Sequence, residues 1–194
     1  EKMIFQGIIE KKYKKKILSR RDGREGVFQF SASDFDGLCE EELTFKSKRG
    51  HTLWGAFYHY DDVRFTDRVI VFDHGLGSGR RAYMREIEML ARHGYLVYSY
   101  DHTGCTESEG EHIMGLSGSL ADLDDCIRTL KRVEQLSGME ISVVGHSWGG
   151  YSACSVLSYH PDVKAVVECS GFNASHGMFE AEGRKQAGDF IDVM

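Results

Sequence analysis

Residues 141–150 read ISVVGHSWGG, and this stretch decides the fold. The apolar residues 141–144 predict a buried strand, and residues 148–160 predict the helix that follows it. At the junction, residues 145–149 match the pattern Gly-x-Ser-x-Gly. A serine on a strained strand-to-helix turn is lifted above the edge of a sheet, which exposes its hydroxyl for attack. Ser147 is therefore the candidate nucleophile.

The glycines of this motif are expected for steric reasons. A tight turn brings the backbone close to neighbouring strands, so Gly145 and Gly149 stand where a side chain would collide. The helix that begins after Ser147 points the positive end of its dipole at an oxyanion forming there. We expect the backbone N–H of Trp148 to donate to that oxyanion, and His146 to play a structural part.

A second glycine-rich turn, DHGLG at residues 73–77, follows a predicted strand at residues 69–72. Turns in this position supply the other oxyanion donor in serine hydrolases, and the N–H of Leu76 is the candidate. His74 is expected to brace the turn. A dinucleotide-binding loop is the alternative, but the third glycine of G-x-G-x-x-G would fall on Arg80, so the spacing is wrong.

The rest of the chain alternates between strand and helix patterns. Strands are predicted at residues 95–100 and 163–167, helices at 83–91 and from Ser119 to Gly138, a hairpin at 43–60, and an acidic loop at 34–42. Strands joined by crossover helices imply a mostly parallel sheet with helices on both faces. The prediction is one α/β domain.

Composition excludes several other classes of protein. A chain of 194 residues with 41% hydrophobic and 28% charged residues builds one core and is too charged to be mostly membrane-embedded. Its net charge of -6 provides no basic field for nucleic acid, so a small-molecule partner is expected.

Cysteine usage and the N-terminus bear on the cellular setting. The five cysteines are odd in number and never form a CxxC pair, which predicts reduced thiols in a cytoplasmic protein without a disulfide framework or a zinc site. Residues 3–18 predict a basic amphipathic helix that packs on the domain. Contact of this helix with an anionic membrane surface is the alternative.

Three motifs in order carry a family resemblance: HGLGSG at 74–79, YDHTGCTES at 100–108 and GHSWGG at 145–150. Together they resemble the α/β-hydrolase superfamily, particularly its branch of monoacylglycerol lipases, lysophospholipases and serine aminopeptidase-like enzymes. The resemblance covers about residues 42–172 and implies an α/β-hydrolase fold, a mostly parallel sheet with helices on both faces.

The resemblance also implies roles for individual residues. Ser147 would be the nucleophile, and Leu76 and Trp148 would be the oxyanion donors. The turn from Asp101 to Gly104 is structural in the family, so Asp101 is not expected to be the triad acid. The residues implied to shape the site are His74, Gly75, Gly145, Gly149, Asp101 and Gly104.

The triad acid and base are not identifiable in this chain. A serine needs a histidine to take its proton and an acid to orient that histidine, and in the family both follow the nucleophile after further strands. Only His160 and His176 follow Ser147, and we expect neither to act as base. Asp162 and Glu168 are expected to have supporting or solvated roles.

The expected organisation is accordingly an incomplete fold that lacks its last strands. Residues 1–41 would form an N-terminal helix and loop, 42–172 the hydrolase core, and 173–194 the start of a lid. The expected function is cleavage of a small acyl ester or a peptide through an acyl-serine, with no cofactor and no metal. The alternatives are an inactive binding scaffold, a membrane-associated lipase and an acyltransferase.

Overall fold

The computed structural model describes residues 29–63 and 66–172. The basic helix predicted at residues 3–18 and the lid predicted at 173–194, with His176, lie outside these ranges. No helix within the ranges is both long and apolar enough to cross a bilayer.

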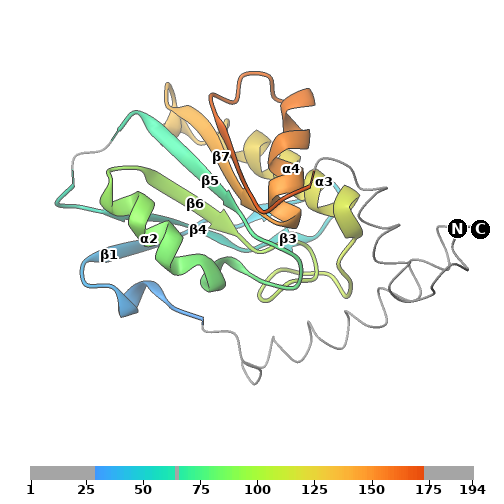
Figure 1. Ribbon diagram of the computed structural model, residues 1–194, viewed down its shortest axis with the longest axis horizontal. Coiled ribbons are helices and arrows are strands. Elements are labelled where there is room, and N and C mark those ends of the chain that lie inside the picture. Colours follow the sequence, from blue (N-terminus) through green and yellow to red (C-terminus); the bar gives the residue numbers. More distant parts are fainter. Residues whose placement is uncertain (1–28, 64–65, 173–194) are drawn as a thin grey trace, which may run out of the picture.

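A six-stranded sheet organises the chain, in the order β1-β4-β6-β5-β7-β8 (Figure 1). The four strands from β6 to β8 run parallel, whereas β4 is antiparallel to both of its neighbours. The strands are β1 (Leu38–Glu42), β4 (Gly55–Tyr60), β5 (Arg68–Asp73), β6 (Leu96–Tyr100), β7 (Glu140–His146) and β8 (Val166–Cys169). The predicted mostly parallel sheet is confirmed.

Helices cover both faces of this sheet, as expected (Figure 1). On one face, α2 (Met84–Arg92) buries Ile87 against β4 and β6. On the other, α3 (Gly115–Leu130) and α4 (Trp148–Ser155) pack on the strands, with Leu123 and Ile127 fully buried. Each such aliphatic side chain contributes about 1.5 to 3 kcal/mol of stability through burial.

The N-terminal part of the fold differs from the prediction in two ways. Residues 34–42 were expected to form a loop, but Leu38–Glu42 is the edge strand β1, because an edge tolerates charged side chains and Glu40 accepts a hydrogen bond from Tyr58 at 2.8 Å. The expected hairpin is a two-stranded ribbon, β2 (Phe45–Lys46) with β3 (Thr52–Leu53), while β4 joins the main sheet. β1 thus crosses the boundary predicted after residue 41.

Three helix boundaries also differ. The helix predicted from Ser119 to Gly138 begins one turn earlier, at Gly115, and ends at Leu130, with Ser119 buried within it. Ser119 and Asp122 have the three-residue spacing of a helix cap, but inside α3 they make the tertiary contacts described below. The helix after Ser147 ends at Ser155 and is continued by a 3-10 turn, Val156–Ser158, which is shorter than the predicted span to residue 160.

Candidate active site

The turn around Ser147 has the geometry expected of a strained nucleophile elbow. Ser147 lies between β7 and α4 with φ 56° and ψ -113°, in the left-handed half of backbone space that non-glycine residues rarely adopt. Its N–H donates to the carbonyl of Cys169 on β8 at 2.9 Å, and its carbonyl accepts from Tyr151 at 3.1 Å. The surrounding main chain therefore holds the strained turn.

The two glycines of the elbow are required by close backbone contacts. A Cβ on Gly145 would lie 2.2 Å from the carbonyl oxygen of Gly149, and a Cβ on Gly149 would lie 2.1 Å from the carbonyl oxygen of Asp73. Real carbon and oxygen atoms do not approach so closely, so neither position can hold a side chain without moving the backbone. The second contact also joins the elbow to the end of β5.

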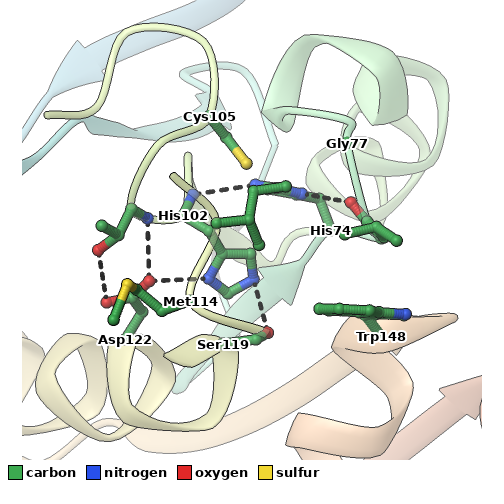
Figure 2. A pocket seen from close by; sticks show the side chains of 12 residues that line it. His74, Gly77, His102, Cys105, Met114, Ser119, Asp122 and Trp148 are labelled. Carbon is green, nitrogen blue, oxygen red and sulfur yellow. Dashed lines mark hydrogen bonds and ion pairs between the residues drawn. The ribbon is translucent and has the colours of Figure 1, made fainter. Parts of the chain in front are cut away.

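The turn after β5 lies beside the elbow, as the parallel pairing of β5 with β7 requires. Gly75, Leu76 and Trp148 line one pocket (Figure 2). Trp148 is the first residue of α4, so its N–H has no carbonyl partner inside the helix.

Tyr83 connects this turn to the elbow. The N–H of Gly75 donates to the Tyr83 hydroxyl at 3.1 Å, and that hydroxyl is 2.8 Å from Nδ1 of His146. His146 is thus linked through Tyr83 to the turn after β5, and its structural role stays a prediction.

His74 braces the same turn from inside. Its Nδ1 lies 2.8 Å from the Gly75 carbonyl and must donate, while its Nε2 accepts from the N–H of His102 at 3.0 Å. Burial, with the positive charge of His102 nearby, lowers the pKa of His74 to about 4. His74 is therefore a neutral tautomer with both ring nitrogens engaged, which suits bracing rather than proton transfer.

Asp101 is occupied by a buried ion pair. Arg80 donates to it twice, from the backbone N–H at 2.8 Å and from Nη1 at 2.5 Å. The turn then needs Gly104, whose φ is 76° and whose added Cβ would lie 2.6 Å from the carbonyl of His112. Both carboxylate oxygens of Asp101 are thus engaged by Arg80, which ties the loop after β6 to the segment after β5.

A charge network that the sequence did not reveal lies beneath this turn. The Nε2 atom of His102 lies 3.0 Å from the Asp73 carboxylate. Its Nδ1 atom lies 3.5 Å from the Asp122 carboxylate (Figure 2). Burial alone would lower its pKa, but the two carboxylates outweigh burial and raise the pKa of His102 to about 10. Asp122 also pairs with Arg49, and Asp73 accepts from the Tyr100 hydroxyl.

One part of this network resembles a catalytic triad. The Ser119 hydroxyl lies 3.2 Å from Nε2 of His102, whose Nδ1 faces Asp122. However, the second carboxylate, Asp73, keeps His102 doubly protonated near neutral pH, and an imidazolium cannot take a proton from serine. Ser119 is also buried, one turn into α3, and lies within hydrogen-bond distance of the Ser152 hydroxyl, at 2.9 Å. The arrangement is structural.

A small pocket, partly open to solvent, lies in front of the network. Its walls combine apolar side chains with the polar groups already described (Figure 2). Besides His74, Gly75, Leu76, Gly77 and Trp148, the lining residues are His102, Thr103, Cys105, Ile113, Met114, Ser119 and Asp122.

The other residues considered as acid or base lie in separate contacts. His160 is buried between Asp124, at 2.8 Å from Nε2, and Lys131, at 3.0 Å from Nδ1. Asp162 pairs with the same Lys131 at 2.6 Å, and Glu168 accepts from the Cys154 thiol at 3.3 Å. Within residues 29–63 and 66–172, no hydrogen bond joins a histidine to the Ser147 hydroxyl.

The sheet order, the elbow and the turn beside it define an α/β-hydrolase fold. Within that class, residues 65–187 match the family described as serine aminopeptidase, S33, and the chain belongs to this family. An esterase structure from Pyrococcus furiosus is similar over 84% of this chain and 61% of its own, with 24% identity and a TM-score of 0.69. Brefeldin A esterase covers 90% of this chain and 52% of its own at 19% identity, with a TM-score of 0.66.

Two curated relatives match over about half of the chain. A putative non-heme haloperoxidase of Mycobacterium phage D29 is 33% identical over 100 residues, and a pyrethroid hydrolase of Sphingobium wenxiniae is 28% identical over 97 residues. The matches cover 50% of this chain in each case, and 33% and 32% of the relatives. The chain thus spans about a third of the length of these relatives.

Proposed function

We propose that the chain carries the nucleophile half of a serine hydrolase that cleaves a carboxylic ester or amide through an acyl-Ser147 intermediate. The observation that carries this proposal is the strained backbone of Ser147, φ 56° and ψ -113°, at the start of α4. Such strain is retained where it serves function, and here it coincides with the family's nucleophile position.

The proposed reaction begins with attack of the Ser147 oxygen on the substrate carbonyl carbon. A histidine takes the serine proton, and the carbonyl oxygen becomes an oxyanion that accepts hydrogen bonds from the N–H groups of Leu76 and Trp148. The same histidine then protonates the leaving alcohol or amine, and water releases the acid in a second round. We assign this histidine and its acid to sequence outside residues 29–63 and 66–172.

The pocket supports a small acyl substrate. Leu76, Ile113 and Met114 supply apolar wall, which suits an acyl or alkyl group, and the pocket begins at the proposed oxyanion donors. The pyrethroid hydrolase relative is consistent with a hydrolytic reaction, and the family description adds a peptide as the other substrate class. No group in this scheme needs a cofactor.

We further propose a cytoplasmic location and retain the division into an N-terminal segment, a hydrolase core and a lid segment. All five cysteines carry free thiols, two of them exposed, which suits a reducing compartment. The core, predicted to begin at residue 42, should be extended to include β1 because that strand pairs with β4 along its whole length.

Hydrolysis of short-chain aryl esters by the full-length protein tests the proposal. Ser147→Ala should lower kcat/KM by about 10⁴-fold or more, because removal of a nucleophile leaves only the background of the remaining site. Ser158→Ala, at an exposed serine just beyond α4, is the matched control and should retain wild-type activity. Ester turnover that survives Ser147→Ala would refute the proposal.

A wild-type protein that is folded but inert would favour the binding scaffold. Acyl transfer, the other alternative, would appear as ester product when a second alcohol is added.

A further inference from the structure

A thiol, an imidazole and a carboxylate come together at the edge of the sheet farthest from β8. Cys39 on β1 and His59 on β4 are directly paired across the two strands, so their side chains project from the same face. Asp61 follows two residues after His59. The ligand atoms of Cys39, His59 and Asp61 all lie within 4.8 Å of one another.

The imidazole of His59 has a defined orientation in this cluster. Its Nδ1 faces the Asp61 carboxylate at 3.3 Å, and its Nε2 faces the Glu41 carboxylate at 3.4 Å. A histidine that binds a metal through one nitrogen usually donates its other N–H to a carboxylate, which fixes the ring. Glu41 occupies that second position, on the same face of β1 as Cys39.

From this arrangement we propose a Zn²⁺ site in which Cys39 Sγ, His59 Nδ1 and an Asp61 oxygen bind the metal, water completes the coordination, and Glu41 holds Nε2. Zinc accepts sulfur, nitrogen and oxygen ligands at about 2.0 to 2.3 Å, which places tetrahedral ligands about 3.4 Å apart. His59 Nδ1 and the Asp61 oxygen already have this spacing, at 3.3 Å, and all three ligand atoms lie within 4.8 Å, so a small adjustment of the side chains completes the site. Asp61 is exposed and lies beyond the end of β4, so it can make the adjustment.

The charges of the cluster favour a cation. The carboxylates of Asp61 and Glu41 lie on either side of the His59 ring, at 3.3 and 3.4 Å from its two nitrogens. Binding of Zn²⁺ would release the thiol proton of Cys39 to solvent and create the thiolate–metal bond. A thiolate with an imidazole selects zinc over Mg²⁺ and Ca²⁺, which prefer oxygen ligands alone.

The cluster is separate from the proposed active site. Gly55 pairs with Tyr100 and Tyr58 with Val97, so the Tyr60 end of β4 lies at the amino ends of the parallel strands, whereas Ser147 follows the carboxyl end of β7. A metal there would join β1 to the end of β4 and stabilise the sheet edge. Its role is therefore structural and independent of the hydrolase chemistry.

Metal binding to the full-length protein, first stripped with a chelator, tests the proposal. We expect one equivalent of Zn²⁺ to bind in competition with a chromophoric chelator, and excess Mg²⁺ or Ca²⁺ not to displace it. Co²⁺ used as a spectroscopic substitute should give a thiolate-to-cobalt charge-transfer band. Absence of stoichiometric Zn²⁺ binding would overturn the site.

Variants identify the ligands. Cys39→Ser should abolish the charge-transfer band, and Cys39→Ser, His59→Ala and Asp61→Asn should each weaken Zn²⁺ binding about 100-fold. Glu41→Gln should weaken binding 10- to 100-fold while the band remains, since it removes only the partner of the ligand. Cys154→Ser, at an exposed thiol on α4, is the matched control and should change neither measurement.

A band that persists in Cys39→Ser, or one that disappears in Cys154→Ser, would assign the metal to other residues and refute the proposal. Circular dichroism of each variant without metal reports whether it is folded. Asp61→Asn changes an exposed side chain and so tests the site even if a change at His59 disturbs the strand.

Discussion

The elbow at residues 145–149 and the loops beneath it at 73–76 and 101–104 form one site, but different forces hold them. The elbow is fixed by backbone crowding, in which a Cβ on either glycine would lie within about 2.2 Å of a carbonyl oxygen. The loops are fixed by buried charge, with Arg80 on Asp101 and His102 between two carboxylates. The comparison shows that the residues meeting a steric requirement lie close together in the sequence, whereas the residues of a buried charge network come from distant segments.

The buried ion pair is expected to give the largest effect on stability. Asp101→Asn would leave the guanidinium of Arg80 without its buried partner, and should lower the free energy of unfolding by about 3 to 5 kcal/mol. Glu107→Gln removes the other, partly exposed partner of Arg80 and should cost less than about 1 kcal/mol. Urea denaturation measures both, and equal losses would show that the loop does not depend on the buried pair.

The crowded elbow should respond somewhat less strongly. Gly149→Ala would push a methyl group into the carbonyl of Asp73 and should cost about 3 kcal/mol, with loss of esterase activity. Gly138→Ala is the control, because a methyl group there meets no atom within 4 Å. Only its positive φ of 86° disfavours alanine, and this should lower the free energy of unfolding by about 1 to 2 kcal/mol. Equal losses in urea denaturation, or an active Gly149→Ala enzyme, would contradict the steric account of the elbow.

The two histidines beneath the site should give opposite pH dependences. The pKa of His102 is about 10 in the folded protein and 6.5 in the unfolded chain. Its contribution to the free energy of unfolding is therefore complete below pH 6.5 and is lost as the pH rises to 10. His74, with a folded pKa of about 4, contributes fully above pH 6.5 and loses that contribution as the pH falls to 4. Each slope is at most about 1.4 kcal/mol per pH unit.

Denaturation across pH 4 to 10 measures these slopes. His102→Gln should flatten the dependence of the free energy of unfolding on pH above pH 6.5, and His74→Gln should flatten it below pH 6.5. His93→Gln, at an exposed histidine, should change neither slope. An alkaline side that keeps its slope in His102→Gln would mean that the network does not hold a charged imidazole.

The sequence predicted the parts of the molecule that depend on local spacing. The parallel strands and the helix α2, predicted at residues 83–91 and found at Met84–Arg92, follow from apolar periodicity. The positions of Gly145 and Gly149 follow from the geometry of a tight turn. The family resemblance identified the turn from Asp101 to Gly104. It did not identify Arg80 as the residue that pairs with Asp101.

The rest could not be predicted because it depends on tertiary pairing. Asp122 looked like part of a helix cap, yet its partners Arg49, His102 and Thr103 come from segments up to 73 residues away. Cys39 and His59 likewise meet only through the pairing of β1 with β4, and β1 was expected to be a loop. The sequence held one sign of this charge network: Asp73 and His102 are ionisable residues that follow two predicted strands.

The central claim is that Ser147, and not Ser119, has the activated hydroxyl. Treatment of the full-length protein with a fluorophosphonate, followed by peptide mass mapping, tests it directly. The account predicts a single adduct on Ser147 that is absent from Ser147→Ala and unchanged in Ser119→Ala. An adduct on Ser119, or a folded and esterase-active protein with none on Ser147, would contradict it.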